Sequence, residues 1–323
     1  MLRTHGFNVR ATVASAAKPI IASVAKQSNI KYFQTVRRLL RHFVPRNDPL
    51  CKGSLRKIRT IRYIPFLFLA FSFPAAAETR EYRIAYVGDS AHTAYLGVLQ
   101  GLDEANLQGQ FLGQRYTLDV FPVNEALQAD YSAYIAVAVA ADRDTFLELT
   151  GRLAGMPVFN LALEDDDLRA ACLANALHII PSRQMKADAV AQWRQKNPDS
   201  HAVAQTWHPD FVKFAARDLN KRFLKAHNTP MDDYAWAGWA AIKMASDTIA
   251  RENIATPAAL LEFLKTGLVF DGQMGVELNF RPTGQLRQPM LLVDDGKIAG
   301  EAPVRGVADD LDSLGNIECA ERQ

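Results

Sequence analysis

Apolar and polar positions alternate with two different periods over residues 82–195. Short apolar runs bounded by Gly, Asp or Pro are typical of strands, and an apolar residue at every third or fourth position is typical of a helix. The expected strands are Tyr82–Val87, Tyr116–Val123, Tyr134–Ala140, Pro157–Leu161 and Leu173–Ile180. The expected helices are Ala94–Ala105, about Arg143–Ala154, and a third that begins after its N-cap Ser182 and runs to about Gln195. Strands that alternate with helices predict an α/β fold with a mostly parallel sheet.

The pattern changes after residue 200, where helices dominate and strands come late. We expect a strand at His201–Trp207, helices at Phe211–Ala226, Met231–Arg251 and Pro257–Lys265, and strands at Met274–Phe280 and Met290–Val293 with a turn at 294–296. The acidic run Glu164–Asp167 is expected to be a loop, either solvated or binding a cation.

A basic run (Arg56, Lys57, Arg59, Arg62) precedes the apolar run 64–73, and small residues follow at 75–77. A charged segment, a short apolar core and an A-x-A site are typical of a secretory signal. We therefore expect a signal peptide at 55–77, cleaved after Ala77, and a mature periplasmic chain of residues 78–323. The apolar run is far shorter than the ~20 residues that span a membrane, so we expect no stable membrane insertion after cleavage.

Residues 1–54 are interpreted as an N-terminal extension outside the folded protein, spurious or disordered. A misplaced start codon, with initiation near Val44 or Leu55, is the favoured explanation, and an organellar transit peptide or a nucleic-acid-binding tail are the alternatives. Residues 1–62 hold 14 Lys and Arg against one acid, Asp48, and the rest of the chain holds 23 against 34. The chain beyond residue 62 thus carries −11, which argues against binding nucleic acid or anionic membranes.

The mature chain lacks the usual motifs of nucleotide-binding proteins, hydrolases and zinc proteases, and its histidines lack ligand spacing. We therefore expect no enzyme activity, no cofactor and no metal. Cys172 and Cys319 remain after cleavage, and they either form one disulfide or stay as two free thiols.

In a parallel α/β sheet, ligands bind beyond the carboxyl ends of the strands, where loops and helix N-termini expose polar groups. After the first strand this rule selects Ser90, His92, Thr93 and Tyr95, and after the strand at 157–161 it selects Asn160, Ala162 and Leu163. Trp236 and Trp239, with Tyr234, form an aromatic cluster on the long helix, as core residues or as contacts of a ligand cleft; of these, Tyr234 and Trp239 are the candidate ligand contacts.

Residues 82–109 (YRIAYVGDSAHTAYLGVLQGLDEANLQG) resemble the opening of type I periplasmic binding proteins of the branched-chain amino acid class. Residues 168–193 (LRAACLANALHIIPSRQMKADAVAQW), TWHP at 206–209 and FRPTGQLRQPMLLV at 280–293 resemble solute-binding proteins associated with pyrroloquinoline-quinone-dependent alcohol oxidation. This leucine-binding-protein-like resemblance implies two parallel-sheet lobes that close on a small-molecule solute and deliver it to ABC permease subunits. It places the Ser90–Tyr95 and Asn160–Leu163 loops on the cleft wall, and the Tyr234–Trp239 region near the crossing between lobes.

The chain departs from this family at two places. Relatives carry several strand–helix units where this chain has only the seven residues Arg194–Ser200, and many read Gly-Tyr-Asp-Ala where this chain has Gly238-Trp239-Ala240-Ala241. We therefore expect lobe 1 at 78–193 and 232–268, and a truncated second lobe at 194–231 and 269–323. The change around Trp239 argues against a standard amino-acid ligand, and a non-transporting sensor or interaction subunit is the alternative function.

Overall fold

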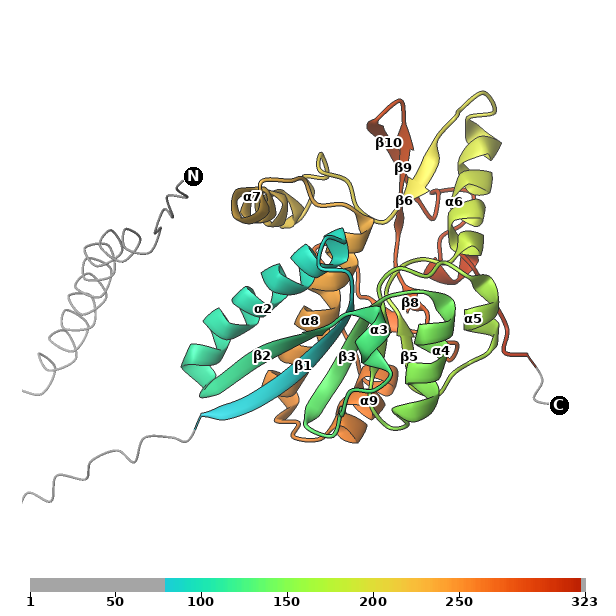
Figure 1. Cartoon of the computed structure of the whole chain (residues 1–323). Coiled ribbons are helices and arrows are strands. Elements are labelled where there is room, and N and C mark those ends of the chain that lie inside the picture. The colour runs from blue at the N-terminus through green and yellow to red at the C-terminus, as the bar shows by residue number, and fades with distance from the viewer. Residues whose placement is uncertain (1–78, 321–323) are drawn as a thin grey trace, which may run out of the picture. The chain divides into compact units, whose positions relative to one another are not determined.

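The computed structural model describes residues 79–320 (Figure 1). The expected signal peptide at 55–77 and the extension 1–54 lie outside the described residues. Within residues 79–320, no helix is both long enough and apolar enough to cross a membrane.

The core of the protein is a five-stranded sheet in which every strand runs parallel to its neighbours. Its strands, in the order β2-β1-β3-β4-β5, are β1 (Arg80–Gly88), β2 (Gln114–Phe121), β3 (Tyr134–Ala140), β4 (Val158–Asn160) and β5 (Ala176–His178). All residues of β3 are buried, as expected for a central strand that is covered on both faces. The predicted α/β fold with a parallel sheet is thus confirmed.

Helices cover both faces of this sheet (Figure 1). One face carries α2 (Thr93–Leu112), α8 (Asp233–Glu252) and α9 (Pro257–Thr266), and the other carries α3 (Val123–Ala126), α4 (Arg143–Arg152) and α5 (Asp166–Ala170). The backbones of α2 and α8 touch, because a Cβ on Gly97 would lie 1.8 Å from the Ala235 carbonyl and one on Gly238 would lie 2.1 Å from the Ala94 carbonyl. This contact brings the N-termini of both helices to the carboxyl edge of the sheet.

The second part of the chain holds a smaller sheet in the order β10-β9-β6. Its elements are α6 (Arg183–Lys196), β6 (Val203–Gln205), α7 (Ala216–His227), β9 (Met290–Asp294) and β10 (Lys297–Ala302), with the short pair β7 (Asn279–Phe280) and β8 (Leu286–Arg287) beside them. All its pairings are antiparallel, which corrects the parallel second sheet that the resemblance implies. The reason is local: Asp295 and Gly296 both have positive φ, which makes the tight turn of an antiparallel hairpin. The division into two lobes at the predicted boundaries stays a prediction.

Several predicted boundaries are wrong. The acidic run is not a loop throughout, because α5 begins at Asp166. The strand expected at Met274–Phe280 is reduced to its last two residues, since Gly272, Gln273 and Gly275 adopt positive φ and form turns. The helix expected from Phe211 begins at Ala216, after a positive φ at Phe214. The expected strand Leu173–Ile180 is shortened to β5, and α3 and β10 were not predicted.

The GQLRQP motif joins the two parts of the chain beside β5. The His178 N–H donates to the Gly284 carbonyl (2.7 Å), and the Gln288 side chain donates to the Ile179 carbonyl (2.8 Å). Gly284 has φ +78°, and a Cβ there would lie 2.2 Å from the Ala176 carbonyl, so this crossing requires glycine.

A disulfide attaches the C-terminal segment to the first sheet. Cys172, two residues after α5, is bonded to Cys319, and their Cα atoms are 5.6 Å apart. Beside it, the Ala320 N–H donates to the Ala170 carbonyl (2.8 Å). The same segment contacts α6, because the Gly315 N–H donates to Asp188 (2.7 Å).

Candidate functional site

The carboxyl edge of the parallel sheet gathers the helix N-termini of α2, α6 and α8. His92, Ser182 and Asp232 cap these helices, each accepting a backbone N–H through its side chain. The turn after β1 starts at Gly88, whose φ is +152° and whose missing Cβ would lie 2.5 Å from the Ala140 carbonyl. The sequence thus builds a polar edge from capping residues, at the place where parallel sheets bind ligands.

The first helix turn of α2 is joined to that of α8. The Thr93 hydroxyl donates to Asp232 Oδ2 (2.8 Å), and Asp232 Oδ1 accepts the Ala235 N–H (2.8 Å). The His92 ring meets the edge of the Tyr234 ring at 5.0 Å between centroids. The start of α2 (residues 92–93) and the start of α8 (residues 232–234), which are far apart in the sequence, therefore form one surface.

A lysine from α6 completes this surface. Lys186 Nζ lies 2.6 Å from Glu164 Oε1, in the loop after β4, and 3.8 Å from Asp233 Oδ2. Burial raises the pKa of Asp233, while the Trp207 N–H that it accepts and the Lys186 charge act in the opposite direction. Burial also raises the pKa of Tyr234, as does the nearby charge of Glu164. The edge cluster, as we define it, consists of His92, Thr93, Glu164, Lys186, Asp232, Asp233 and Tyr234.

The loop after β4 is shaped from beneath by Asn160. Its Oδ1 accepts the N–H groups of Ala162 (3.2 Å) and Leu163 (2.8 Å), and its Nδ2 donates to the Leu163 carbonyl (2.7 Å). Asn160 is fully buried, so its role here is to position the loop, and the half-buried Ala162 and Leu163 lead directly to Glu164.

Arg169 holds the same edge together from inside. Its guanidinium donates to the carbonyls of Leu163 (2.7 Å), Asp165 (2.9 Å) and Ile180 (2.8 Å) and to Gln285 Oε1 (2.8 Å). Burial lowers its pKa to about 10, so it stays protonated at neutral pH. One buried cation therefore ties the loops after β4 and β5 to the GQLRQP crossing.

The remaining predicted residues divide into two groups. Ser90 lies exposed in the turn before α2, and the half-buried Tyr95 packs on Tyr86 (5.2 Å between centroids) just behind the edge cluster. Trp239 does not reach the edge cluster. It is buried, its indole N–H donates to Glu104 Oε2 (3.0 Å), and its ring centroid lies 6.0 Å from that of Phe270.

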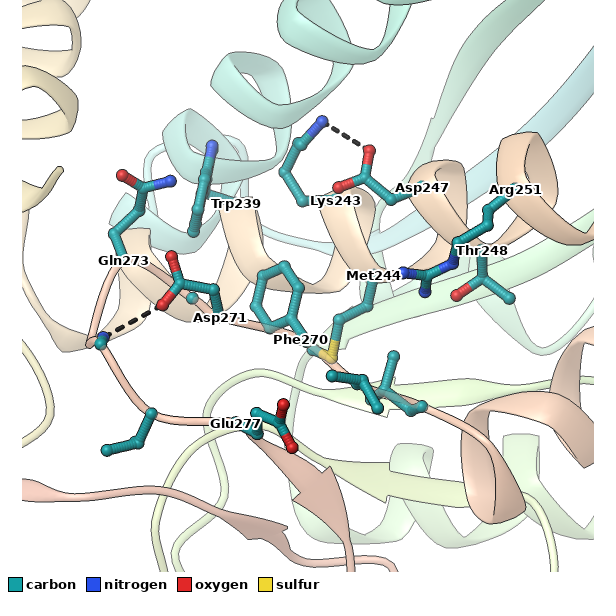
Figure 2. Close-up of a pocket in the computed structure, with 15 residues that line it drawn as sticks. Trp239, Lys243, Met244, Asp247, Thr248, Arg251, Phe270, Asp271, Gln273 and Glu277 are labelled. Atoms are coloured by element: carbon teal, nitrogen blue, oxygen red, sulfur yellow. Dashed lines mark hydrogen bonds and ion pairs between the residues drawn. The ribbon is translucent and has the colours of Figure 1, made fainter. Parts of the chain in front are cut away.

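Trp239 instead lines a cavity of about 520 Å³ between α8 and the segment 268–277, here named the α8 cavity (Figure 2). Residues of α8 that line it with Trp239 are Lys243, Met244, Asp247, Thr248 and Arg251. From the segment 268–277, its lining includes Leu268, Val269, Phe270, Asp271, Gln273, Val276 and Glu277.

The edge cluster combines hydrogen-bond donors with acceptors. Lys186, His92 and Tyr234 can donate, whereas Glu164, Asp232 and Asp233 accept. Such a mixed set suits reversible binding of a small polar molecule. Within residues 79–320, no group of three or more His, Cys, Asp or Glu side chains is placed to hold a metal ion.

Sequence reasoning missed Glu164, Arg169, Lys186, Asp232 and Asp233. The sequence reading treated the acidic run 164–167 as one unit, but each of its acids has its own partner. Glu164 pairs with Lys186 and Asp165 with Arg183, while Asp166 accepts the Gln184 N–H and Asp167 pairs with Arg143. The capping pattern before α8 could have indicated the position of Asp232. Nothing in the local sequence distinguishes Arg169 from a surface arginine.

His178 makes the stability of the folded protein depend on pH. Its Nδ1 accepts from Asn160 Nδ2 (3.0 Å), which leaves the buried Nε2 without a partner among the described residues. Burial lowers the pKa of His178 well below its ordinary value of 6.5. Below pH 6.5 the His178 side chain therefore binds a proton in the unfolded chain but not in the folded chain. As the pH is lowered, the free energy of unfolding decreases by about 1.4 kcal/mol per pH unit.

We expect His178→Gln to lose this part of the acid sensitivity. Urea unfolding at pH 7.5, 6.0 and 5.0 measures it, with the exposed His201→Gln as a control that keeps the wild-type slope. Equal slopes for His178→Gln and wild type would show that His178 does not control acid stability.

Comparisons with known proteins give the fold a name. No family model and no curated protein sequence matches the chain. Among solved structures, a branched-chain amino acid ABC transporter periplasmic ligand-binding protein from Burkholderia xenovorans matches with a TM-score of 0.59 at 11% identity, over 68% of this chain and 95% of that one. The fold is that of the type I periplasmic binding proteins.

Two other solved proteins of this fold contain a ligand. The ABC transporter substrate-binding protein from Desulfitobacterium hafniense in complex with Leu matches at TM-score 0.55 and 14% identity, over 68% of this chain and 99% of that one. LivJ from Streptococcus pneumoniae in complex with isoleucine matches at TM-score 0.56 and 9% identity, over 69% of this chain and 99% of that one. These type I periplasmic binding proteins are substrate-binding proteins rather than enzymes, and at such identities the likeness to this chain extends to the fold alone.

Proposed function

We propose that this protein is the periplasmic solute-binding component of an ABC importer and that it holds a small polar solute at the edge cluster. The observation that carries the proposal is the meeting of Lys186, Glu164 and Asp233 at the carboxyl edge of a type I periplasmic-binding-protein sheet. The expected secretory signal supports an exported location, with the ABC permease subunits as partners.

The resemblance to proteins of pyrroloquinoline-quinone-dependent alcohol oxidation narrows the solute to be sought. Two features argue against a standard amino acid as the solute. The edge cluster has three carboxylates but one lysine, and the region where many relatives read Gly-Tyr-Asp-Ala holds the buried Trp239. Alcohols, short diols and the acids formed from them are therefore tested beside leucine and isoleucine.

A thermal-shift screen of the purified protein with these solutes tests the proposal. A solute present at 100 times its Kd should stabilise the folded protein by about 2.7 kcal/mol. Lys186→Met removes a charged donor worth about 1.5–3 kcal/mol, so it should weaken binding roughly 10- to 150-fold. Lys213→Met removes a comparable Lys–Glu pair with Glu301 outside the edge cluster and should bind normally. The proposal fails if nothing on the panel binds, or if both variants bind alike.

A second candidate function, a non-transporting sensor or interaction subunit, is favoured by the contacts between the two parts of the chain. Arg222 Nε on α7 donates to Glu104 Oε1 on α2 (3.0 Å), and Trp207 stacks on Trp236 of α8 (6.0 Å between centroids, 19° between planes). Hinge closure would have to accommodate these contacts. Co-purification with a dehydrogenase or histidine kinase and without a permease would favour this function, and recovery of a permease alone would favour import.

A further inference from the structure

The α8 cavity has the size and apolar surface of a small-molecule site. Its volume of about 520 Å³ falls within the range of about 300–1,000 Å³ that is usual for ligand pockets. Met244, Leu268 and Phe270 form its apolar floor, and Val269 and Val276 are exposed at its rim. An apolar group of a ligand would gain burial here without displacing a side chain.

Polar atoms in this cavity have unused hydrogen-bonding capacity. Thr248 is fully buried, and neither its hydroxyl nor the Gln273 side-chain carbonyl has a partner among residues 79–320. A buried polar atom without a partner costs about 1–3 kcal/mol. Both atoms are buried in the protein without ligand, so a ligand would pair with them only after the side chain rotates toward the cavity.

The charges around the cavity favour a cation. Lys243 is already paired with Asp247 (2.7 Å) and Arg251 with Glu252 (3.3 Å). Asp271 accepts the Gly275 N–H (3.0 Å), but within the described chain neither Asp271 nor Glu277 has a cationic partner. In Figure 2, Asp271 and Gln273 lie beside Trp239 at one end of the cavity, with Phe270 next to them.

The loop that carries these acceptors is held in a fixed and unusual conformation. Gly272, Gln273 and Gly275 all have positive φ, which is uncommon for glutamine. The Trp236 indole donates to the Gly272 carbonyl (3.1 Å) and anchors the loop on α8. Backbone strain that is kept in place by such anchors is typical of ligand sites.

We propose that the α8 cavity is a second binding site, separate from the edge cluster, for a small organic amine with an apolar body. Its ammonium group donates to Asp271 and lies near the aromatic faces of Trp239 and Phe270, while the carboxylate of Glu277 adds negative charge to the same cavity. Its apolar body covers Met244 and Leu268. An anion of the same shape is repelled, and a neutral alcohol lacks the charge.

Calorimetric titration of the full-length purified protein tests the chemistry. The probes are phenethylamine and n-hexylamine, each compared with its alcohol (2-phenylethanol, 1-hexanol) and its carboxylate (3-phenylpropionate, heptanoate). At least one amine should bind roughly tenfold or more tightly than its alcohol, and the carboxylates should not bind. If neither amine binds, or if the three members of each set bind alike, the proposal is overturned.

Variants locate the site. Asp271→Asn with Glu277→Gln keeps the shape of two exposed side chains and should weaken amine binding roughly tenfold or more. Two controls should leave amine binding unchanged: Glu301→Gln, which alters an exposed ion pair elsewhere, and Lys186→Met, which alters the edge cluster. Conversely, the Asp271→Asn/Glu277→Gln double variant should bind a solute at the edge cluster as the wild type does. Wild-type amine affinity in the double variant, or its loss in Lys186→Met, would contradict a site in the α8 cavity.

Discussion

Arg169→Met is expected to lower the free energy of unfolding by about 3–5 kcal/mol. The substitution removes the guanidinium that donates to four acceptors. The Leu163 and Ile180 carbonyls keep a second donor, in Asn160 and Gln285 respectively, whereas the Asp165 carbonyl and the Gln285 side-chain oxygen lose this one. Each acceptor left without a partner costs about 1–3 kcal/mol, and removing the buried guanidinium offsets part of the sum. Urea denaturation followed by circular dichroism measures the change.

The matched control for Arg169 is Arg183, which lies on the same edge. The Arg183 side chain is 67% exposed and pairs with Asp165 at 3.3 Å, so Arg183→Met should cost less than about 1 kcal/mol. If both variants lose the same small amount, Arg169 does not organise the edge loops. A folded Arg169→Met protein should also bind the edge-cluster solute more weakly, since the loop that carries Glu164 loses its support.

Loss of the Cys172–Cys319 disulfide is expected to cost about 2–5 kcal/mol. The bond closes a segment with a sequence separation of 147 residues, and such a large loop gains much conformational freedom in the unfolded state once it is opened. The double variant Cys172→Ser/Cys319→Ser should therefore unfold at a lower urea concentration than the oxidised wild type.

Reduction of the wild type provides the control for this prediction. Protein produced from residue 78 onward has no other cysteine, so a reducing agent should move the unfolding midpoint of this wild-type protein to that of the double variant. The same agent should leave the double variant unchanged. A wild-type midpoint that is insensitive to reduction would show that the bond is absent or does not stabilise the protein.

The first sheet could be predicted because its signals are local. A short, continuously apolar run such as Tyr134–Ala140 is typical of a strand buried on both faces, and Ser182 caps α6 as its sequence position predicts. The loops at the carboxyl edge then follow from the parallel arrangement, which places His92, Thr93 and the residues after Asn160 at one side of the sheet.

The rest of the site depends on contacts that no local pattern encodes. Thr93 donates to Asp232, which is 139 residues away in the sequence. Lys186 forms an ion pair with Glu164, although the acidic run 164–167 has the composition of a solvated loop. The sequence left Trp239 either in the core or at a ligand cleft, and the structure buries it with its indole N–H on Glu104 and its side chain lining the α8 cavity. In the second sheet, the turn at Asp295 makes the β9–β10 hairpin locally, but the pairing of β9 with β6 joins segments that lie far apart in the sequence.

Hydrogen–deuterium exchange of the purified protein, with and without the tightest-binding solute of the alcohol and amino-acid panel, tests the central claim most directly. Binding at the edge cluster predicts slower exchange in segments 89–95, 161–166 and 232–236, and no change at 268–277. Protection confined to 268–277, or protection nowhere, would contradict the assignment of the solute site to the carboxyl edge of the sheet.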